Sequence, residues 1–566
     1  MTAQEQEKDQ GSIKRIFRTE TSFLLIGFVL LWFVFYKYFK GGPVSTDVIY
    51  YFNLGQLKVA DPFVLNRYFH IYLQKLFVDL AQNPLSGMQS MWACILSAIT
   101  IGTYLLARLI TPASTPLHGI IAVGMLLSIK SIPITAGVPY ADLTVTFMSV
   151  ALVILWLLFL RSTKRQAGLL IFIGIITYLG FKTKEIFLST AVVLIGIFIV
   201  NDRINLKEGS RRSVNILLGM FIGAVFFQLA HAIVLGNPLF GLRSQDYQIF
   251  NETYATRFLS MALNTAHANP YGNFIYLFLA IPFAFYLIGV SSQKHIDLPS
   301  RIVWGIPLFY IGLMVYLLKY REFYNHRFFL PLLPFLCAFG IQFIPFGSHA
   351  EPNNLKSLTK YLLIGFLGAL LMYGLKRIIV QSGQDSALYM DVVILPITLT
   401  LLFIVQLIIN KGIIKSMLLT ALTIALLLPP FIDNVRELVI DQQNYKVFTQ
   451  AASPLYDLGK AIEIQPETKV AIEQKAVLTD AVAFYKDKNE ISALYNLVND
   501  TFTTKSNFVF LVSESDIAEI GLCGSQYDYY LISQNSWDSI NVTDCLGSTY
   551  RIEKQINSGL ILLSSK

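Results

Sequence analysis

Long apolar runs separated by short polar segments fill the chain from about residue 21 to residue 431. The runs are roughly 15 to 22 residues long, which is enough for a helix to cross the ~30 Å hydrocarbon layer of a bilayer. The pattern predicts about 13 spanning helices, of which the third contains Lys130 and Pro133 and the fifth is short. The predicted spans are residues 21–38, 88–109, 117–134, 143–160, 168–181, 186–200, 214–235, 274–290, 302–318, 328–344, 361–375, 392–409 and 417–431.

The pattern changes after about residue 432, where the apolar runs shorten to the length of strands. Polar, helix-like stretches such as residues 480–485 lie between them, and no glycine-rich phosphate loop is present in this part of the sequence. This predicts a small α/β domain with strands at residues 469–472, 508–512, 527–532 and 560–563. The chain is therefore expected to have a tail (1–20), a polytopic α-helical membrane module (21–431) and a soluble domain (432–566).

Composition agrees with a membrane protein and excludes an ordinary soluble one. Hydrophobic residues make up 54% of the chain and charged residues only 14%, whereas soluble domains carry about 25% charged residues. The mean hydropathy is +0.55. The net charge of +8 is explained by basic cytoplasmic loops, so we expect no nucleic-acid partner. The first apolar run lacks a small-residue cleavage site and should stay as an anchor.

The distribution of Lys and Arg predicts the orientation in the membrane. Basic residues gather in the N-terminal tail and in alternate loops, which places those segments in the cytoplasm. An odd number of spans then puts the C-terminal domain outside, and we expect a multi-pass protein of a bacterial inner or plasma membrane. Three Asn-x-Ser/Thr triplets fall on the predicted outer side, beginning at Asn251, Asn499 and Asn541.

The four cysteines divide between the two environments. Cys94 and Cys337 lie in predicted membrane helices as small apolar residues, whereas Cys523 and Cys545 lie in the C-terminal domain. An outside location permits a disulfide between Cys523 and Cys545, and two free thiols remain the alternative.

Two acids stand at the ends of predicted membrane helices on the outer side. Asp47 lies in the loop that follows the first span, and Asp142 opens the fourth span. Ionisable groups at such places are costly to desolvate and are candidates for function. The tyrosines of the first outer loop are interpreted as an interfacial aromatic belt, but Asp47 fits neither a belt nor an ion-pair spacing.

Several cations also lie on the outer side, where the orientation signal disfavours them. Lys182 and Lys184 occupy a tight turn between two apolar runs, and Arg321, His326 and Arg327 precede another run. Lys and Arg make charge-assisted hydrogen bonds to phosphate oxygens, so binding of an anionic phosphate explains them, above all Lys184 and Arg327. Contact with lipid headgroups is the alternative.

These features together resemble the type C glycosyltransferases, in the branch of the protein O-mannosyltransferases and the lipid A aminoarabinose transferases. The resemblance rests on an acid in the first outer loop, Pro139-Tyr140-Ala141-Asp142, a lysine after the fifth span, and the run from His326 to Pro334. It covers residues 21–431 and implies a sugar donor carried on a polyprenyl phosphate.

The resemblance also implies roles for single residues. Asp47 would be the catalytic base or acceptor positioner, Asp142 would take the second acidic position, and Lys184 and Arg327 would hold the donor phosphate. Many relatives have two adjacent acids in the first loop, but Val48 follows Asp47 here, which puts a bound divalent metal in doubt. Further candidates for substrate binding are Arg67, Tyr140, Arg243 and His326.

The expected reaction is an inverting transfer of a sugar from the polyprenyl phosphate to a hydroxyl of a lipid, protein or glycan on the outer face. A polymerase or ligase of an envelope polysaccharide is the nearest alternative. A membrane transporter is a second, although the sequence has no clear internal repeat of the kind that many transporters show. A receptor or scaffold that works through its C-terminal domain is a third.

Overall fold

The computed structural model of the chain describes part of the membrane module and the strands of the C-terminal domain. The residues described are 3–39, 51, 62–81, 84–110, 114–129, 139–161, 166–192, 194, 206–241, 286, 304–310, 326–343, seven positions between 418 and 432, 469–473, 507–511, 528–534, 537, 550–556 and 560–565.

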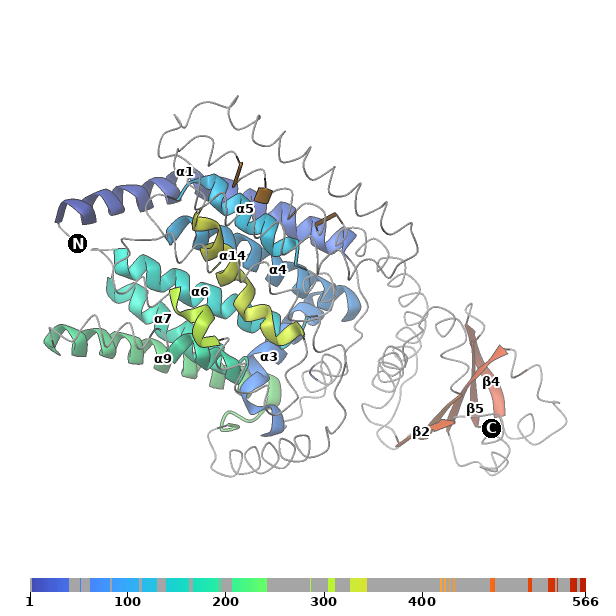
Figure 1. Cartoon of the computed structure of the whole chain (residues 1–566). Coiled ribbons are helices and arrows are strands. Elements are labelled where there is room, and N and C mark those ends of the chain that lie inside the picture. The colour runs from blue at the N-terminus through green and yellow to red at the C-terminus, as the bar shows by residue number, and fades with distance from the viewer. Residues whose placement is uncertain are drawn as a thin grey trace, which may run out of the picture.

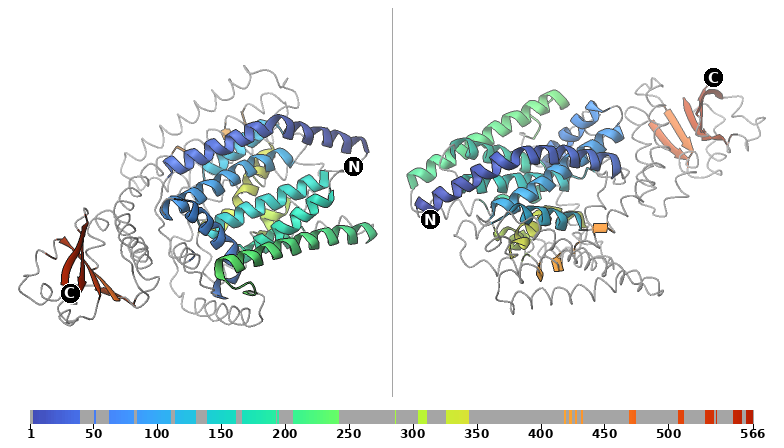
Figure 2. Two further views of the ribbon diagram at one scale, coloured as in Figure 1. Left: turned by 180° about the vertical axis from the view of Figure 1, so that it is seen from behind. Right: turned by 90° about the horizontal axis from the view of Figure 1, so that it is seen from above.

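Five long helices lie side by side in a row. In order across the row, each contacting the next, they are α1 (Ala3–Tyr38), α4 (Pro84–Leu109), α6 (Ala141–Arg161), α7 (Gln166–Phe181) and α9 (Leu206–Leu235). Figure 1 shows the row from one side, and the left view of Figure 2 shows it from behind. Consecutive neighbours joined by short loops run antiparallel, so the start of α6 and the end of α7 lie at the same end of the row.

Shorter elements pack on one face of this layer of five helices, and helix α3 packs near one end of the helices. Helix α5 (Pro116–Leu127) and helix α14 (Leu333–Gly340) pack on α4 and on each other. The 3₁₀ helices η4 (His326–Leu332) and η5 (Ile341–Phe343) flank α14, and η4 contacts α6. Helix α3 (Tyr68–Leu80) follows the 3₁₀ turn η1 (Pro62–Arg67) and contacts both α4 and α9.

The chain is a helical membrane protein. Among the described residues, four helical segments are long and apolar enough to cross a bilayer: Glu20–Tyr38, Ser86–Leu109, Ala141–Leu160 and Gly209–Leu235. They match the predicted spans at 21–38, 88–109, 143–160 and 214–235. The total of about 13 cannot be compared, because most of the remaining predicted spans lie outside the described residues.

The inner and outer helices of the row differ in what they expose. Most of α4 and α6 is buried, whereas α1 and α9 expose large apolar side chains such as Phe23, Leu25, Leu217 and Phe221. Such apolar surface is expected where a helix faces lipid. Polar side chains inside α4 are bonded within the helix: Ser97, Thr100 and Thr103 donate to the carbonyls four residues earlier.

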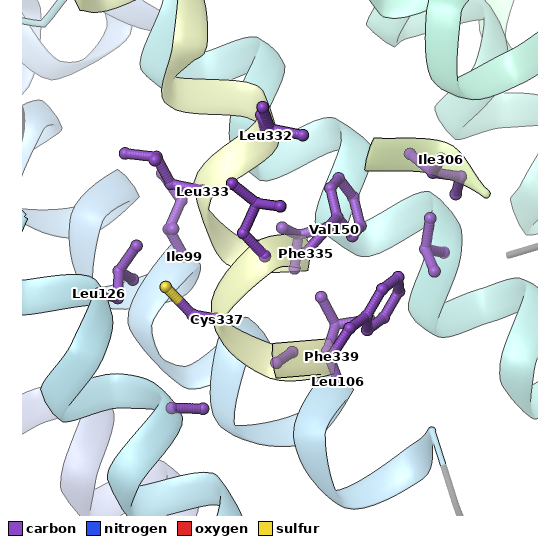
Figure 3. Packing of buried hydrophobic residues seen from close by; sticks show 14 of the residues in the cluster. Ile99, Leu106, Leu126, Val150, Ile306, Leu332, Leu333, Phe335, Cys337 and Phe339 are labelled. Carbon is purple, nitrogen blue, oxygen red and sulfur yellow. The ribbon is translucent and has the colours of Figure 1, made fainter. Parts of the chain in front are cut away.

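The core lies where α14 enters the space between α4, α5 and α6. Figure 3 shows Leu333, Cys337 and Phe339 of α14 against Leu126 of α5 and Val150 of α6. Trp304 stacks on Phe339 with ring centroids 5.1 Å apart. Cys337 is a buried free thiol, and Cys94 is a half-buried one, so both serve as small apolar residues as predicted.

Two predicted spans take a different form in the structure. Helix α5 ends at Leu127, before Lys130 and Pro133, because Ser128 caps it: its N–H and hydroxyl both donate to the Gly124 carbonyl. The run at 328–344 begins as the 3₁₀ helix η4 and continues as α14. The ring of Pro331, inside η4, would collide with the carbonyl of Arg327 in an α-helix.

The C-terminal strands form one mixed sheet in the order β2-β1-β3-β5-β4. Four of them match the predicted strands: β1 (Lys469–Glu473), β2 (Asn507–Leu511), β3 (Tyr529–Ser533) and β5 (Leu560–Ser565). The fifth, β4 (Tyr550–Ile556), was not predicted. The β1 strand pairs parallel with β2 and β3, and β5 pairs antiparallel with β3 and β4. The sheet stands apart from the helices in Figures 1 and 2.

Helices α7 and α9 approach so closely that their backbones touch at glycines. A Cβ atom added to Gly219 would lie 2.0 Å from the Ile171 carbonyl oxygen, and one added to Gly174 would lie 2.1 Å from the Ile216 oxygen. Backbone atoms cannot move aside as a flexible side chain can, so the glycines fix the spacing of these two helices.

We therefore predict that Gly219→Ala destabilises the protein. The added methyl group must push α7 and α9 apart, and overpacking of this kind costs about 1–3 kcal/mol. The measurement is thermal or denaturant unfolding of the purified protein in detergent.

Gly124→Ala in α5 is the matched control, because a Cβ there meets nothing within 4 Å and alanine favours a helix by up to about 1 kcal/mol over glycine. Equal stabilities of the two variants would show that the α7–α9 contact does not set the spacing.

Candidate functional site

Two of the predicted site residues meet where α6 begins and α7 ends. Asp142 lies in the first turn of α6, and Lys184 lies in the turn that follows α7. The Lys184 ammonium donates to Asp142 Oδ1 at 2.6 Å, although 42 positions separate the two residues. Both are buried, with relative exposures of 2% for Asp142 and 9% for Lys184. The antiparallel packing of α6 on α7 produces this ion pair.

Local structure holds each partner in place. The partial positive charge of the α6 N-terminus favours the Asp142 carboxylate, and the Thr146 hydroxyl donates to the Asp142 carbonyl at 2.6 Å. After α7 the chain makes a tight turn in which the N–H of Thr183 donates to Gly180 and the N–H of Phe187 donates to the Lys184 carbonyl. The turn thus directs Lys184 toward α6.

A buried histidine lies beside the ion pair. His70 of α3 is fully buried, and its Nδ1 is 2.9 Å from the Thr144 hydroxyl, two residues after Asp142. Burial lowers the pKa of His70 to about 3; the Asp142 carboxylate opposes this shift, whereas the charges of Lys184 and Arg67 add to it. The imidazole is therefore neutral at pH 7, and its bond to Thr144 joins α3 to α6.

The other predicted residues near α3 contact aromatic or apolar groups. Arg67 donates a hydrogen bond to the Tyr51 hydroxyl and lies over the Tyr51 ring, 5.8 Å from its centroid. Tyr140 precedes α6, accepts the N–H of Leu143 at its carbonyl, and packs its side chain against the cluster of Val78 and Met88.

A second buried histidine lies on the opposite side of α3. His231, near the end of α9, is fully buried and forms a hydrogen bond through Nδ1 with the Tyr72 hydroxyl. Lys182 is also buried and lies over the rings of Phe181 and Phe227. Sequence reasoning singled out neither His70 nor His231. A signal existed for His231, because it is an ionisable residue inside an apolar run.

The remaining predicted residues are placed less fully or not at all. His326 and Arg327 begin η4, whose backbone packs on α6. Asp47, Arg243, Cys523 and Cys545 lie outside the described residues, so their roles and the disulfide stay predictions. Within the described ranges, no group of three or more His, Cys, Asp or Glu side chains is arranged to hold a metal ion.

This arrangement suits the recognition of an anionic substrate group. Helix α3 is surrounded by Arg67, the lysines of the turn after α7 and the two buried histidines, in a largely apolar setting. Charge interactions strengthen where water is excluded, and a neutral imidazole can donate a hydrogen bond to an anion or accept a proton.

No protein-family model matches the chain, and no curated protein sequence matches it. Among solved structures, the chain is similar to ArnT from Cupriavidus metallidurans bound to undecaprenyl phosphate, with 9% identity, a TM-score of 0.47 and coverage of 96% of this chain and 97% of that one. It is also similar to the oligosaccharyltransferase of Archaeoglobus fulgidus in its apo form, with 12% identity, a TM-score of 0.45 and coverage of 92% and 70%.

We predict that the two members of the ion pair are energetically coupled. Lys184→Met leaves the Asp142 carboxylate buried without its cation, and breaking a buried pair in this way costs roughly 3–5 kcal/mol. Combining Lys184→Met with Asp142→Asn removes both charges and should recover part of that loss. Unfolding of the two single variants and the double variant gives the coupling energy.

Lys75→Met is the control for this cycle. Lys75 forms an exposed ion pair with Asp79 at 3.1 Å within α3, and such pairs contribute at most about 1 kcal/mol. Strictly additive losses in the Asp142 and Lys184 variants would contradict the prediction.

His70 gives a second prediction, for the dependence of stability on pH. The unfolded chain binds a proton at this histidine as the pH falls below about 6.5, whereas the folded chain does so only near pH 3. Stability should therefore fall as the pH drops from 6.5 toward 3, by up to about 1.4 kcal/mol per pH unit from this group.

His70→Gln removes that contribution, so unfolding free energies measured at pH 7 and pH 5 should differ less in the variant than in the wild type. The same pH slope in both proteins would show that His70 is not held neutral by the fold.

Proposed function

We propose that the chain is a membrane glycosyltransferase that moves a sugar from a polyprenyl phosphate to an acceptor hydroxyl on the outer face of the membrane. The observation that carries the proposal is the buried Asp142–Lys184 ion pair, 2.6 Å long, at a helix end rich in cations. The order of sequence motifs, from the acid at position 47 to the run at 326–334, supports the same reaction.

A buried ion pair is weak support for a purely structural role. Taking two charges out of water costs more than their attraction returns in many proteins, and apolar replacements are often as stable. An acid and a base retained inside a membrane bundle are therefore functional candidates by default. In this proposal the donor binds at the outer membrane boundary with its phosphate near the pair.

The proposed chemistry is a single displacement. The acceptor oxygen attacks the anomeric carbon, the bond from that carbon to the phosphate oxygen breaks, and the polyprenyl phosphate leaves with the bonding electrons. Asp47 accepts the proton of the acceptor hydroxyl, and the configuration at the anomeric carbon inverts. General-base action of this kind contributes about 10²–10⁴-fold to the rate.

The cations have a separate role in this proposal. Charge grows on the phosphate oxygens as the bond breaks, and the Lys184 ammonium and the Arg327 guanidinium stabilise it. Asp142 holds the Lys184 ammonium in position through the ion pair, and the contact of η4 with α6 carries the backbone of Arg327 toward the same helix.

The proposal includes a cellular arrangement. Residues 21–431 form the transferase module, residues 432–566 form an extracytoplasmic domain, and the N-terminal tail is cytoplasmic. The basis is the alternation of basic residues between loops. The acceptor is a lipid, protein or glycan.

The experiment is transfer from a synthetic polyprenyl-phosphate sugar by the purified full chain. Asp47→Asn keeps the shape of the side chain but cannot accept a proton at neutral pH, so we predict that kcat falls by roughly 10²–10⁴-fold. The variant should still fold and bind the donor, as judged by its melting temperature and a donor-binding titration.

Asp79→Asn on α3 is the matched control, because Asp79 is half exposed and pairs only with Lys75 among the described residues. Normal turnover in Asp47→Asn would remove this residue from the mechanism. A product built from many sugar units would favour a polysaccharide polymerase, and donor flux without hydrolysis or transfer would favour a transporter.

A further inference from the structure

Two consecutive residues in the first turn of α3 contact the two segments that carry the buried ion pair. The N–H of Phe69 donates to the Lys182 carbonyl at 3.1 Å, in the turn after α7. The side chain of His70 reaches the other segment, because its Nδ1 lies 2.9 Å from the Thr144 hydroxyl in α6. One turn of α3 therefore touches both the place where α6 begins and the place where α7 ends.

The contact made by Phe69 depends on how this end of α3 is held. The first N–H groups of a helix have no partner within the helix, and Phe69 is the second residue of α3, so its N–H is available to the turn after α7. The contact joins two backbone groups. His70, the next residue, supplies the side-chain hydrogen bond that holds the same turn of α3 against α6.

The imidazole of His70 lies along the segment that contains Asp142. The fully buried ring is bonded to Thr144 and also interacts with the Pro139 carbonyl, although Nε2 makes no hydrogen bond of ordinary geometry with the described residues. Burial lowers the pKa of His70, and Asp142 and Lys184 add smaller shifts, Asp142 upward and Lys184 downward. Both members of the ion pair therefore lie close enough to act on the ring.

A third segment meets the same imidazole. The ring of Tyr51 packs edge-on against His70 with centroids 5.6 Å apart, and Tyr51 is itself buried. In the sequence Tyr51 follows Asp47, the proposed base, by four positions. His70 thus contacts α6 and the segment between α1 and α3 at once.

From these contacts we propose that His70 is a positioning residue for the Asp142–Lys184 pair. Phe69 and His70, here named the α3 clip, hold the turn after α7 and the start of α6 at one spacing, which fixes the direction of the Lys184 ammonium. His70 acts through the pair rather than on the reacting atoms. The catalytic consequence rests on the proposed transfer: an ammonium displaced by about 1 Å stabilises the leaving phosphate less well, and such a misplacement costs up to about 10²-fold in rate.

The test compares the coupling of Asp142 and Lys184 in two backgrounds of the full chain in detergent. Unfolding of Asp142→Asn, Lys184→Met and the double variant gives the coupling, first in the wild type and then in His70→Phe. The phenyl ring fills similar space but has no nitrogen to bond Thr144. We expect the coupling, written as a ratio of unfolding equilibrium constants, to fall roughly tenfold in His70→Phe. The wild-type coupling in folded His70→Phe would overturn the proposal.

A conservative variant separates the hydrogen bond from the packing of the ring. In His70→Asn the side-chain amide places a polar atom near the position of Nδ1, where it can bond the Thr144 hydroxyl, so this variant should keep most of the coupling. Thr144→Val removes the hydroxyl at nearly the same shape and should lower the coupling as His70→Phe does, with no further loss when the two are combined. A full loss of coupling in His70→Asn, or none in Thr144→Val, would contradict the proposal.

Ile71→Val is the matched control for a purely structural role. Ile71 is the next residue of α3 and is fully buried, so its shortening loosens the packing of the helix without removing a polar contact. The variant should lose some stability and keep the wild-type coupling of Asp142 and Lys184. A drop in coupling as large as that of His70→Phe would show that any loosening of α3 has the same effect, and the specific role of His70 would be lost.

Turnover supplies a second readout, which separates this inference from the proposed transfer. With the polyprenyl-phosphate sugar as donor, His70→Phe should lower kcat roughly ten- to a hundred-fold and change the donor KM less, because the cation acts mainly on charge that grows in the transition state. His70→Asn should recover most of the rate. An unchanged kcat beside a lost coupling would remove His70 from the reaction and contradict the positioning role.

The unfolding measurements need no substrate, so the two proposals can fail separately. A chain whose coupling depends on His70 but which transfers no sugar keeps the α3 clip and loses the transferase function. A chain that transfers sugar and shows full coupling in His70→Phe does the reverse. Should His70→Phe fail to fold, Thr144→Val and His70→Asn carry the same comparison, because one lacks the hydrogen bond and the other keeps it.

Discussion

The Asp142 carboxylate and the Lys184 ammonium lie 2.6 Å apart inside an apolar helical bundle. This ion pair constrains how the helices around it pack. Burying either charged group there without its partner would cost several kcal/mol in desolvation. The pair therefore requires α6 and α7 to lie antiparallel, with the start of α6 level with the end of α7. It also requires the tight turn after Phe181, which brings the Lys184 stem back toward the first turn of α6. The glycine contact between α7 and α9 then positions the last helix of the row.

Helix α3 links the two polar clusters of the site. It is a helix of 13 residues between α1 and α4 in the chain, too short to be a membrane span, yet His70 and Tyr68 on it are fully buried. On one side of α3, His70 forms a hydrogen bond with Thr144 in α6. On another side, Tyr68 and Tyr72 pack against His231 in α9. The N–H of Phe69 also donates to the Lys182 carbonyl at 3.1 Å, which anchors the cationic turn. A movement of α3 would therefore alter both clusters together.

The sequence predicted those features that arise from local pattern. Apolar run length located α4, α6 and α7 within about four residues, because a lipid-facing or buried helix needs one continuous apolar stretch. It also located the end of α9, whereas that helix begins at Leu206, before the predicted 214. Four strands followed from short apolar runs. The strand β4 did not, because Arg551, Glu553 and Lys554 interrupt its apolar residues at an exposed edge of the sheet. Charged residues on edge strands discourage pairing with other chains, and they also remove the apolar signal.

Pairing across the fold was beyond the reach of sequence pattern. Asp142 and Lys184 were each selected, one as an acid at a helix end and the other as a cation on the outer side. Their contact depends on helix packing over 42 positions, and no local periodicity encodes that. Nothing in the local sequence pattern singled out His70. Its neutral state arises only when α3 is buried against α6, since the fully exposed imidazole would titrate near pH 6.5.

The 3₁₀ helix η4, which includes Arg327, shows how a covalent constraint sets the path of the backbone. A 3₁₀ helix of seven residues is longer than usual, and Pro331 accounts for it, because an α-helical path would drive its ring into the Arg327 carbonyl. A 3₁₀ helix rises about 2.0 Å per residue and an α-helix about 1.5 Å. Over the residues of η4 the start of the segment therefore lies about 3 Å farther from α14 than an α-helix would place it. The proline thus sets how far along α6 the backbone of Arg327 reaches, while the core around Phe335 and Phe339 fixes the other end.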